Sequence, residues 1–139
     1  YIAWAERNRS AAVRIPLYKP GNEVATRMEL RFPDATCNPY LAFSVMLSAG
    51  LDGLDKKSEC PEPMTMDLYG LTTIEREEMD IGALPHDLFE AVHVAEGSEF
   101  LRNALGEDVH RKLVETKLVE ADKFRLHVSR MDLDEHLML

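Results

Sequence analysis

The chain has 139 residues, of which 45% are hydrophobic, so it is long enough to form about one domain with an apolar core. Its formal net charge of -9 argues against binding of nucleic acid or of an anionic membrane as a property of the whole surface. The charge is uneven, because residues 1–31 hold six Lys or Arg against three acids, whereas the remainder holds ten basic and twenty-two acidic residues. The basic first part therefore predicts a local site for an anion.

Three strand-like segments are predicted near the start of the chain, over residues 1–4, 11–16 and 25–32. Pro16 ends the second segment, and the turn sequence Pro20-Gly21-Asn22 leads towards the third. We therefore expect the second and third segments to form an antiparallel hairpin.

The third segment alternates between charged and apolar side chains, with the period of a strand. Its charged side chains are those of Arg27, Glu29 and Arg31, and like-facing neighbours on a strand lie roughly 7 Å apart. Two interpretations are open: a surface ladder of ion pairs, which stabilises little, or a site in which arginines hold phosphate or carboxylate and the carboxylate holds a hard cation. The hairpin brings Arg14 near this row, but the sequence does not determine the register that would put it on the same face.

Asn38-Pro39 predicts the start of a helix, with Asn as the N-cap and Pro at the first helical position. Residues 40–49 are apolar on nearly all sides, which predicts a helix that is buried over most of its surface. A connector with two prolines comes next, over residues 56–66.

Further helices are predicted from Thr72 onward, each from a start or stop signal beside an apolar pattern. They are a short acidic helix capped by Thr72 or Thr73 through Met79, a stripe of Leu84, Leu88, Ala91 and Ala95, a turn capped by Ser98 and ended by Gly106, a long amphipathic helix to about Val128, and a last helix capped by Asp132 and ending in Leu137-Met138-Leu139. The fold class is therefore α+β, with a small antiparallel β element at the N-terminus (residues 1–35, which hold the candidate site) and a mainly helical body (residues 38–139).

The two cysteines, Cys37 and Cys60, form no CxxC pair and no dense framework, so we expect reduced thiols in a cytoplasmic protein. The sequence contains no signal peptide and no run of about 20 apolar residues that would span a membrane. Because the chain begins at Tyr1, without Met and within a strand-like run, we expect it to be a piece of a longer protein.

Several short motifs share an order and spacing that are specific in combination. They are Asn8-Arg9-Ser10-Ala11, Arg14-Ile15-Pro16, Arg27-x-Glu29-x-Arg31-Phe32-Pro33-Asp34, Asn38-Pro39-Tyr40-Leu41-Ala42-Phe43 and Ala49-Gly50-Leu51-Asp52-Gly53-Leu54. In this combination the chain resembles the C-terminal part of the catalytic domain of type I glutamine synthetase. The motif-level resemblance covers about residues 1–55. Residues 67–139 agree more loosely, through Asp67-Leu68-Tyr69-Gly70-Leu71 and a Lys117-x-x-Glu120 segment.

The resemblance implies an ATP-dependent ligase that phosphorylates the side-chain carboxylate of glutamate and lets ammonia displace the phosphate to give glutamine. It also implies Mg²⁺ or Mn²⁺ as the metal, and a homo-oligomer, which in this family is a dodecamer whose neighbouring subunits complete each site. One carboxylate cannot replace the several-ligand shell of a hard divalent ion, so we expect the isolated chain to be inactive.

The same resemblance implies a role for each residue of the candidate site. Glu29 is similar to a ligand of the divalent ion nearest the ATP phosphates, and Arg31 to the residue that holds substrate glutamate. Arg9 resembles the arginine that contacts the transferring phosphate, while Arg14 and Arg27 resemble those that hold the nucleotide phosphates. This agrees with the chemistry, because phosphoryl transfer spreads negative charge over oxygens that fixed cations must neutralise.

Two departures from the family pattern stand out. The connection from Pro16 to Arg27 is longer than in the best-known bacterial form, so Lys19 cannot be aligned with a nucleotide-contacting basic residue. Tyr69 lies where some members carry the tyrosine that receives an adenylyl group, but Gly70 follows where an acid is common. Tyr69 is thus either a modification site or an ordinary loop tyrosine.

Alternatives to an ammonia ligase stay open within and outside the family. A ligase that joins glutamate to another amine would keep the phosphate-handling arginines, and a non-catalytic structural or sensing relative would have no need of Glu29 among them. An acidic helical interaction module is compatible with composition alone. For the isolated chain, we expect residues 1–35 to be disordered, self-associated or rearranged, because the strand edges lack partners, while the helices from Asn38 persist.

Overall fold

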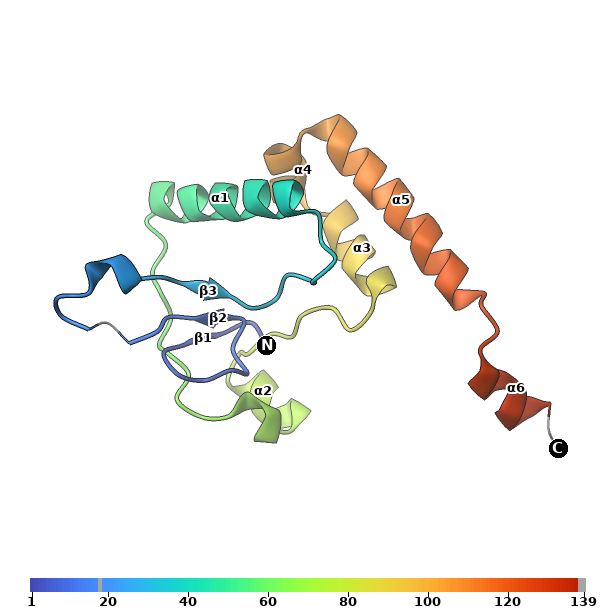
Figure 1. Ribbon diagram of the computed structural model, residues 1–139, viewed down its shortest axis with the longest axis horizontal. Coiled ribbons are helices and arrows are strands. Elements are labelled where there is room, and N and C mark those ends of the chain that lie inside the picture. Colours follow the sequence, from blue (N-terminus) through green and yellow to red (C-terminus); the bar gives the residue numbers. More distant parts are fainter. Residues whose placement is uncertain (18, 138–139) are drawn as a thin grey trace. The chain divides into compact units, whose positions relative to one another are not determined.

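The computed structural model describes residues 1–17 and 19–137 (Figure 1). The chain divides into two compact units, Tyr1–Leu84 (unit 1) and Pro85–Leu139 (unit 2). A small three-stranded sheet comes first and helices make up most of the rest of the chain, which confirms the predicted α+β class.

The sheet of unit 1 has the order β1-β2-β3, with strands β1 (Trp4–Ala5), β2 (Val13–Arg14) and β3 (Glu29–Leu30). Strands β2 and β3 are antiparallel, as predicted for the hairpin, whereas β1 joins β2 in parallel. Each strand is shorter than its predicted segment. Pro16 has no N–H to extend the ladder beyond β2. A 3-10 helix, η1 (Glu23–Ala25), includes the first residue of the third predicted segment, Ala25.

The connector from residues 56 to 72 covers the sheet edge at β1. The backbone N–H of Met64 donates to the Trp4 carbonyl over 2.9 Å, and the Trp4 indole Nε1 donates to the Pro61 carbonyl over 2.6 Å. Leu68, at the end of this connector, is completely buried. The core of unit 1 is small, and its buried apolar residues are Ala5, Ala11, Ala12, Leu68 and Ile81.

Helix α1 (Pro39–Asp55) begins as predicted, because the Asn38 side chain accepts hydrogen bonds from the N–H groups of Tyr40 and Leu41. The prediction that this helix is buried is wrong, since none of its residues, all of them described, is buried. The exposed apolar side chains recur every three or four residues along one stripe: Tyr40, Phe43, Leu47, Leu51 and Leu54. An apolar run predicts that a helix buries its side chains against another element, but no described element of unit 1 packs over this stripe.

Helix α2 (Thr73–Glu78) closes unit 1 and starts at Thr72, one of the two predicted caps. Thr72 and Glu75 form a capping box, in which the Thr72 hydroxyl accepts from the Glu75 N–H and the Glu75 carboxylate accepts from the Thr72 N–H. A 3-10 helix, η2 (Leu68–Gly70), precedes it.

Unit 2 consists of helices α3 (Leu88–Glu96), α4 (Glu99–Leu105), α5 (Glu107–Arg125) and α6 (Arg130–His136). Helices α3 and α4 pack against α5, and the buried side chains are Val92, His110, Val114 and Ala121. Ser98 caps α4 as predicted. Gly106, at φ +79°, ends α4 and begins α5 in a conformation that favours glycine.

Three predictions for unit 2 are corrected. The cap of the last helix is Ser129 and not Asp132, which lies three residues later and completes the capping box from the other side. Helix α5 ends at Arg125, short of the predicted Val128. The sequence predicts that the last helix ends in Leu137-Met138-Leu139, but α6 ends at His136 and Leu137 is its C-cap, while residues 138–139 lie outside the described part of the chain.

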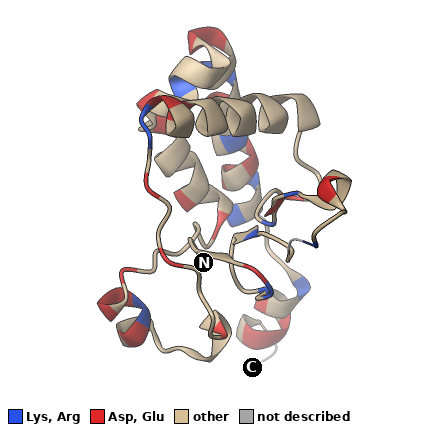
Figure 2. Ribbon diagram, turned by 90° about the vertical axis from the view of Figure 1, so that its left-hand side faces the viewer, with Lys and Arg blue, Asp and Glu red and all other residues tan. Residues whose placement is uncertain are grey.

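Charge is distributed very differently among the helices. Figure 2 shows α1 almost free of charged residues up to its C-terminal end, whereas α2 carries both signs over its short length. Over the described residues, no helix combines the length and the apolar character needed to cross a membrane.

Candidate functional site

The register of the hairpin places Arg14 of β2 directly opposite Glu29 of β3. The Arg14 Nη1 donates to Glu29 Oε2 over 2.9 Å, and the Arg27 Nη2 donates to Glu29 Oε1 over 3.2 Å. One carboxylate is therefore held between two guanidinium groups. Arg14 does share the face of Glu29, a point that the sequence left open.

The pKa of Glu29 is lowered from its ordinary value of 4.5. Partial desolvation acts to raise the pKa, but the hydrogen bond and positive charge of Arg14 and the positive charge and hydrogen bond of Arg27 together outweigh it. Glu29 is consequently ionised at neutral pH. This protonation state suits both a partner of arginine and a ligand of a cation.

The guanidinium of Arg14 is not fully used by Glu29. Its Nε is buried and finds no acceptor among the residues that the structure describes. A buried donor without a partner is uncommon. We therefore expect an acceptor from outside the described residues to bind the Arg14 Nε.

The other predicted site residues, Arg31 and Arg9, are among the described residues and form no ion pair with Glu29. Arg31 continues β3, where its backbone N–H donates to the Ala12 carbonyl over 2.8 Å, and its side chain is exposed. Arg9 is exposed in the loop between β1 and β2. Among the described residues, neither arginine forms an ion pair. Both cations are therefore available to a ligand.

The loop from Pro16 to Arg27 surrounds a hollow beside the cluster. The residues that line it are Pro16, Leu17, Lys19, Asn22, Ala25, Thr26 and Arg27. Lys19, which the sequence could not assign, thus shares a hollow with Arg27. The two cations make this hollow suitable for an anionic group.

The residues present do not by themselves form a metal centre. In the described part of the chain, no three His, Cys, Asp or Glu side chains gather closely enough to hold a metal ion. Glu29 is the one carboxylate of the cluster, and both of its oxygens accept hydrogen bonds from arginine.

Tyr69 lies in η2, and its side chain is 71% exposed. Its ring approaches that of Tyr1 with centroids 5.9 Å apart, and the Arg76 guanidinium lies 4.6 Å from the centroid of the Tyr1 ring. The exposure of the phenol excludes a buried position for Tyr69. It leaves modification site and plain surface tyrosine as the alternatives.

Sequence reasoning missed the polar groups that hold the Arg9 loop. Asn8 Oδ1 accepts from both the N–H and the hydroxyl of Ser10, over 2.9 and 2.7 Å. The Asn-x-Ser spacing is a known signal for such a local turn. The partners at the other end, Met66 and Leu68, carry no signal that links them to this loop.

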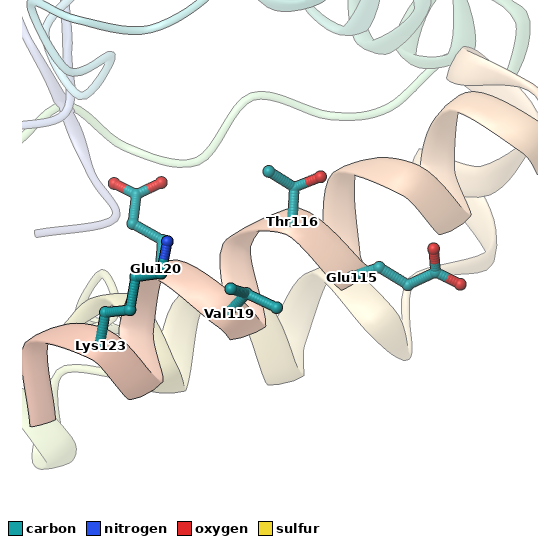
Figure 3. Close-up of a pocket in the computed structure, with 5 residues that line it drawn as sticks. All are labelled: Glu115, Thr116, Val119, Glu120 and Lys123. Carbon is teal, nitrogen blue, oxygen red and sulfur yellow. The ribbon is translucent and has the colours of Figure 1, made fainter. Parts of the chain in front are cut away.

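A second hollow, on α5 in unit 2, has no comparable chemistry. Figure 3 shows its lining residues Glu115, Thr116, Val119, Glu120 and Lys123, all of which come from one helix. Lys117, on the same helix, pairs with Glu120 over 2.6 Å. We therefore place the candidate site in unit 1.

Comparison with known proteins identifies relatives along the whole chain. Residues 1–136 match the family described as "Glutamine synthetase, catalytic domain". Proteins named glutamine synthetase from Methanosarcina mazei, Thermus thermophilus and Thermotoga maritima are 43%, 42% and 41% identical over 139, 136 and 139 residues. These matches cover 98 to 100% of this chain but only 30 to 31% of the relatives, so the chain spans about a third of their length.

Proposed function

Because this chain belongs to the glutamine synthetase family, we propose that it is the part of a glutamate–ammonia ligase that holds the phosphates of ATP. In the proposed reaction, the terminal phosphoryl group of ATP is transferred to the side-chain carboxylate of glutamate, and ammonia then displaces phosphate to give glutamine. The observation that carries this proposal is the carboxylate of Glu29 on β3, held between Arg14 on the adjacent strand β2 and Arg27, which precedes β3.

The arginines supply the fixed positive charge that such a reaction requires. We assign Arg14 and Arg27 to the nucleotide phosphates, because they lie together and Arg27 also lines the neighbouring hollow. Arg9 is assigned to the transferring phosphate and Arg31 to the carboxylate of substrate glutamate. Guanidinium groups suit these roles because they are planar, always charged and able to donate two parallel hydrogen bonds to an oxyanion.

Glu29 is proposed as one ligand of a Mg²⁺ or Mn²⁺ ion in the complete enzyme. When bound, such an ion would neutralise phosphate charge. A carboxylate has about four lone-pair positions, so hydrogen bonds from Arg14 and Arg27 leave room for a further partner. The remaining ligands are expected outside this chain, consistent with its coverage of 30% of its relatives.

The assembly and location of the complete enzyme belong to the same proposal. We propose a homo-oligomer, a dodecamer as expected for the family, in which a neighbouring subunit completes each site. The two cysteines, Cys37 and Cys60, are unpaired and exposed, which supports a reducing, cytoplasmic location. Tyr69 is proposed as a site of adenylyl transfer, to be tested by the mass of its peptide before and after phosphodiesterase treatment.

The test uses the complete enzyme that contains this chain and measures glutamine formed from glutamate, ammonia and MgATP. We expect turnover by the unsubstituted enzyme and a loss of roughly 10²- to 10³-fold in Glu29→Ala, because a ligand of the divalent ion that would neutralise phosphate charge is removed. Glu115→Ala is the matched control, since Glu115 pairs with Arg111 on the surface of α5 over 3.1 Å.

Other outcomes separate the alternatives. Absence of turnover with ammonia, together with turnover on another primary amine, would identify a glutamate–amine ligase. Absence of any ATP-dependent product would indicate a non-catalytic relative. Full activity of Glu29→Ala would remove the role assigned to the cluster. The 139-residue chain alone is expected to form no glutamine, because it supplies one carboxylate of the metal site.

A further inference from the structure

The side chains on both sides of Arg9, those of Asn8 and Ser10, form hydrogen bonds with each other and with distant backbone groups. Asn8 accepts from the N–H and the hydroxyl of Ser10 through its Oδ1, and its Nδ2 donates to the carbonyl of Met66. The Ser10 hydroxyl in turn accepts from the backbone N–H of Leu68 over 3.1 Å. We name these four residues, Asn8, Ser10, Met66 and Leu68, the 8–10/66–68 clamp.

Ser10 and Leu68 form the buried part of the clamp, whereas Asn8 is half-buried and Met66 is exposed. Ser10 is 4% exposed and Leu68 is completely buried, whereas Arg9 is exposed. Removal of the Ser10 hydroxyl would leave the Leu68 N–H buried without a partner, which is more costly than the hydrogen bond itself. The clamp therefore has one stable arrangement, and that arrangement determines how the backbone presents Arg9.

The clamp also joins distant parts of the chain. Its two ends are 58 residues apart, and they connect the loop after β1 to the connector that leads into η2. The same connector is held to β1 by the hydrogen bonds of Trp4 with Pro61 and Met64. The Arg9 loop is thus tied to a scaffold on two sides, as is required of a cation that must meet a phosphoryl group in one geometry.

We infer that Asn8 and Ser10 are positioning residues, which act on catalysis by holding Arg9 at the transferring phosphate. This inference rests on the proposed function, because it takes the role of Arg9 from there. Neither side chain is assigned a contact with substrate, since the Asn8 amide and the Ser10 hydroxyl already form hydrogen bonds within the clamp. Their effect on turnover must therefore pass through Arg9.

The test is a double-mutant cycle in the complete enzyme, with kcat for glutamine formation as the readout. We expect Ser10→Ala to lower kcat by roughly 10-fold or more while KM for ATP changes little, because a small displacement of a catalytic group costs up to about 10²-fold. In an Arg9→Lys background, Ser10→Ala is expected to have almost no further effect on kcat, since the group it positions is already replaced.

Two further variants guard against a simple loss of folding. Ser98→Ala removes the hydroxyl that caps α4 by accepting from the Leu101 N–H, so this variant reports general destabilisation. Its effect on kcat and that of Arg9→Lys should multiply in the double variant. Asn8→Asp is almost the same shape as Asn8 but has no amide to donate to Met66. It replaces Ser10→Ala in the cycle if that variant does not fold.

The outcomes are distinguishable. Multiplication of the Ser10→Ala and Arg9→Lys effects in an active enzyme would overturn the inference and leave the proposed function intact. Absence of glutamine formation by the unsubstituted enzyme would overturn the proposed function, and the inference with it. Loss of amide-exchange protection at Leu68 in Ser10→Ala is expected in addition, and unchanged protection would show that the clamp does not exist in solution.

Discussion

Four of the side-chain hydrogen bonds described in unit 1 connect residues that are 15 to 58 positions apart, in addition to many local ones, whereas in unit 2 nearly all of those described connect residues three or four apart. Arg14 reaches Glu29 across the hairpin, while Arg111 reaches Glu115 along its own helix. Both are arginine–glutamate pairs with similar N–O distances, 2.9 and 3.1 Å. Their difference lies in what they bring together.

A pair within one helix adds little to what the helix already determines. A pair between strands, by contrast, sets the position of groups that the chain would otherwise leave apart. We conclude that a few non-local polar contacts in unit 1 bring together the groups of the candidate site. Unit 2 relies mainly on apolar packing of α3 and α4 against α5.

The largest expected effect comes from removal of Arg14, the arginine that pairs with Glu29 between strands. In the complete enzyme, Arg14→Ala is expected to lower kcat/KM by about 10²- to 10³-fold, because the fixed charge at the phosphates is lost. Arg111→Ala, which removes an arginine–glutamate pair within a helix, should stay within about twofold, as surface pairs contribute little. Equal losses in the two variants would show that location within the chain is not what matters.

The exception in unit 2 is His110, whose Nε2 lies 2.8 Å from the carbonyl oxygen of Ala95, 15 residues away. The side chain is 4% exposed. His110→Ala is expected to lower the free energy of unfolding by about 2–3 kcal/mol, because it leaves a cavity and removes the hydrogen bond to the Ala95 carbonyl. Urea denaturation of the 139-residue chain, followed by circular dichroism, measures this change.

The control is His93→Ala on α3, whose side chain is 60% exposed and lies 3.9 Å from Glu96. It should change stability by less than about 0.5 kcal/mol. If His110→Ala behaved like this control, the packing of α3 against α5 would owe nothing to its one non-local polar contact among the described residues.

Most helix starts could be predicted because capping is a local interaction. Asn38, Thr72 and Ser98 each accept a hydrogen bond from an N–H two or three residues later, and such a signal is contained in the sequence. The cap of the last helix is harder to predict, because both Ser129 and Asp132 are residue types that cap helices. The backbone conformation shows that Ser129 occupies the N-cap position and Asp132 the third helical position.

The burial of α1 is predicted wrongly for a different reason. Its apolar composition is a property of the helix, but burial depends on which other segments reach it, and Phe43 and Leu47 remain exposed at 67% and 66%. Helix α5 is far more polar and yet buries His110, Val114 and Ala121, because its apolar side chains lie on the face that meets α3 and α4.

The site could be predicted in part. The row of Arg27, Glu29 and Arg31 is evident from its strand period, but the pairing of Arg14 with Glu29 requires the register of the hairpin. The link from Ser10 to Leu68 is invisible in the sequence, because nothing near residue 10 refers to residue 68. Local chemistry is therefore predictable here, and its long-range assembly is not.

A smaller effect is expected in the pH dependence of Glu29, the carboxylate of the inter-strand pair. The pKa of Glu29 is below its ordinary value of 4.5, so its charged form contributes stability that is fully present above that pH. This contribution is lost as the pH falls through the lowered pKa, when protonation releases Arg14 and Arg27. We expect the Glu29 carboxyl signal in an NMR titration of the complete enzyme that contains this chain to have its midpoint below 4.5.

The control for this titration exchanges the arginine. Arg14→Gln is expected to raise the midpoint of Glu29 towards its ordinary value, because it removes the strongest of the favourable interactions. Arg111→Gln should leave the midpoint where it is. If the titration midpoint of Glu29 were the same in both variants as in the unsubstituted protein, the cluster would not form in solution.

The smallest expected effect concerns Lys117 and Glu120, whose Nζ and Oε2 atoms are only 2.6 Å apart. Both side chains are more than one third exposed, at 41% and 56%, so water screens the pair despite its short distance. A double-mutant cycle of Lys117→Ala and Glu120→Ala should give a coupling of at most about 0.5 kcal/mol in the free energy of unfolding. A coupling several times larger would contradict the view that pairs within a helix of unit 2 are dispensable, since distance and not sequence separation would then determine their value.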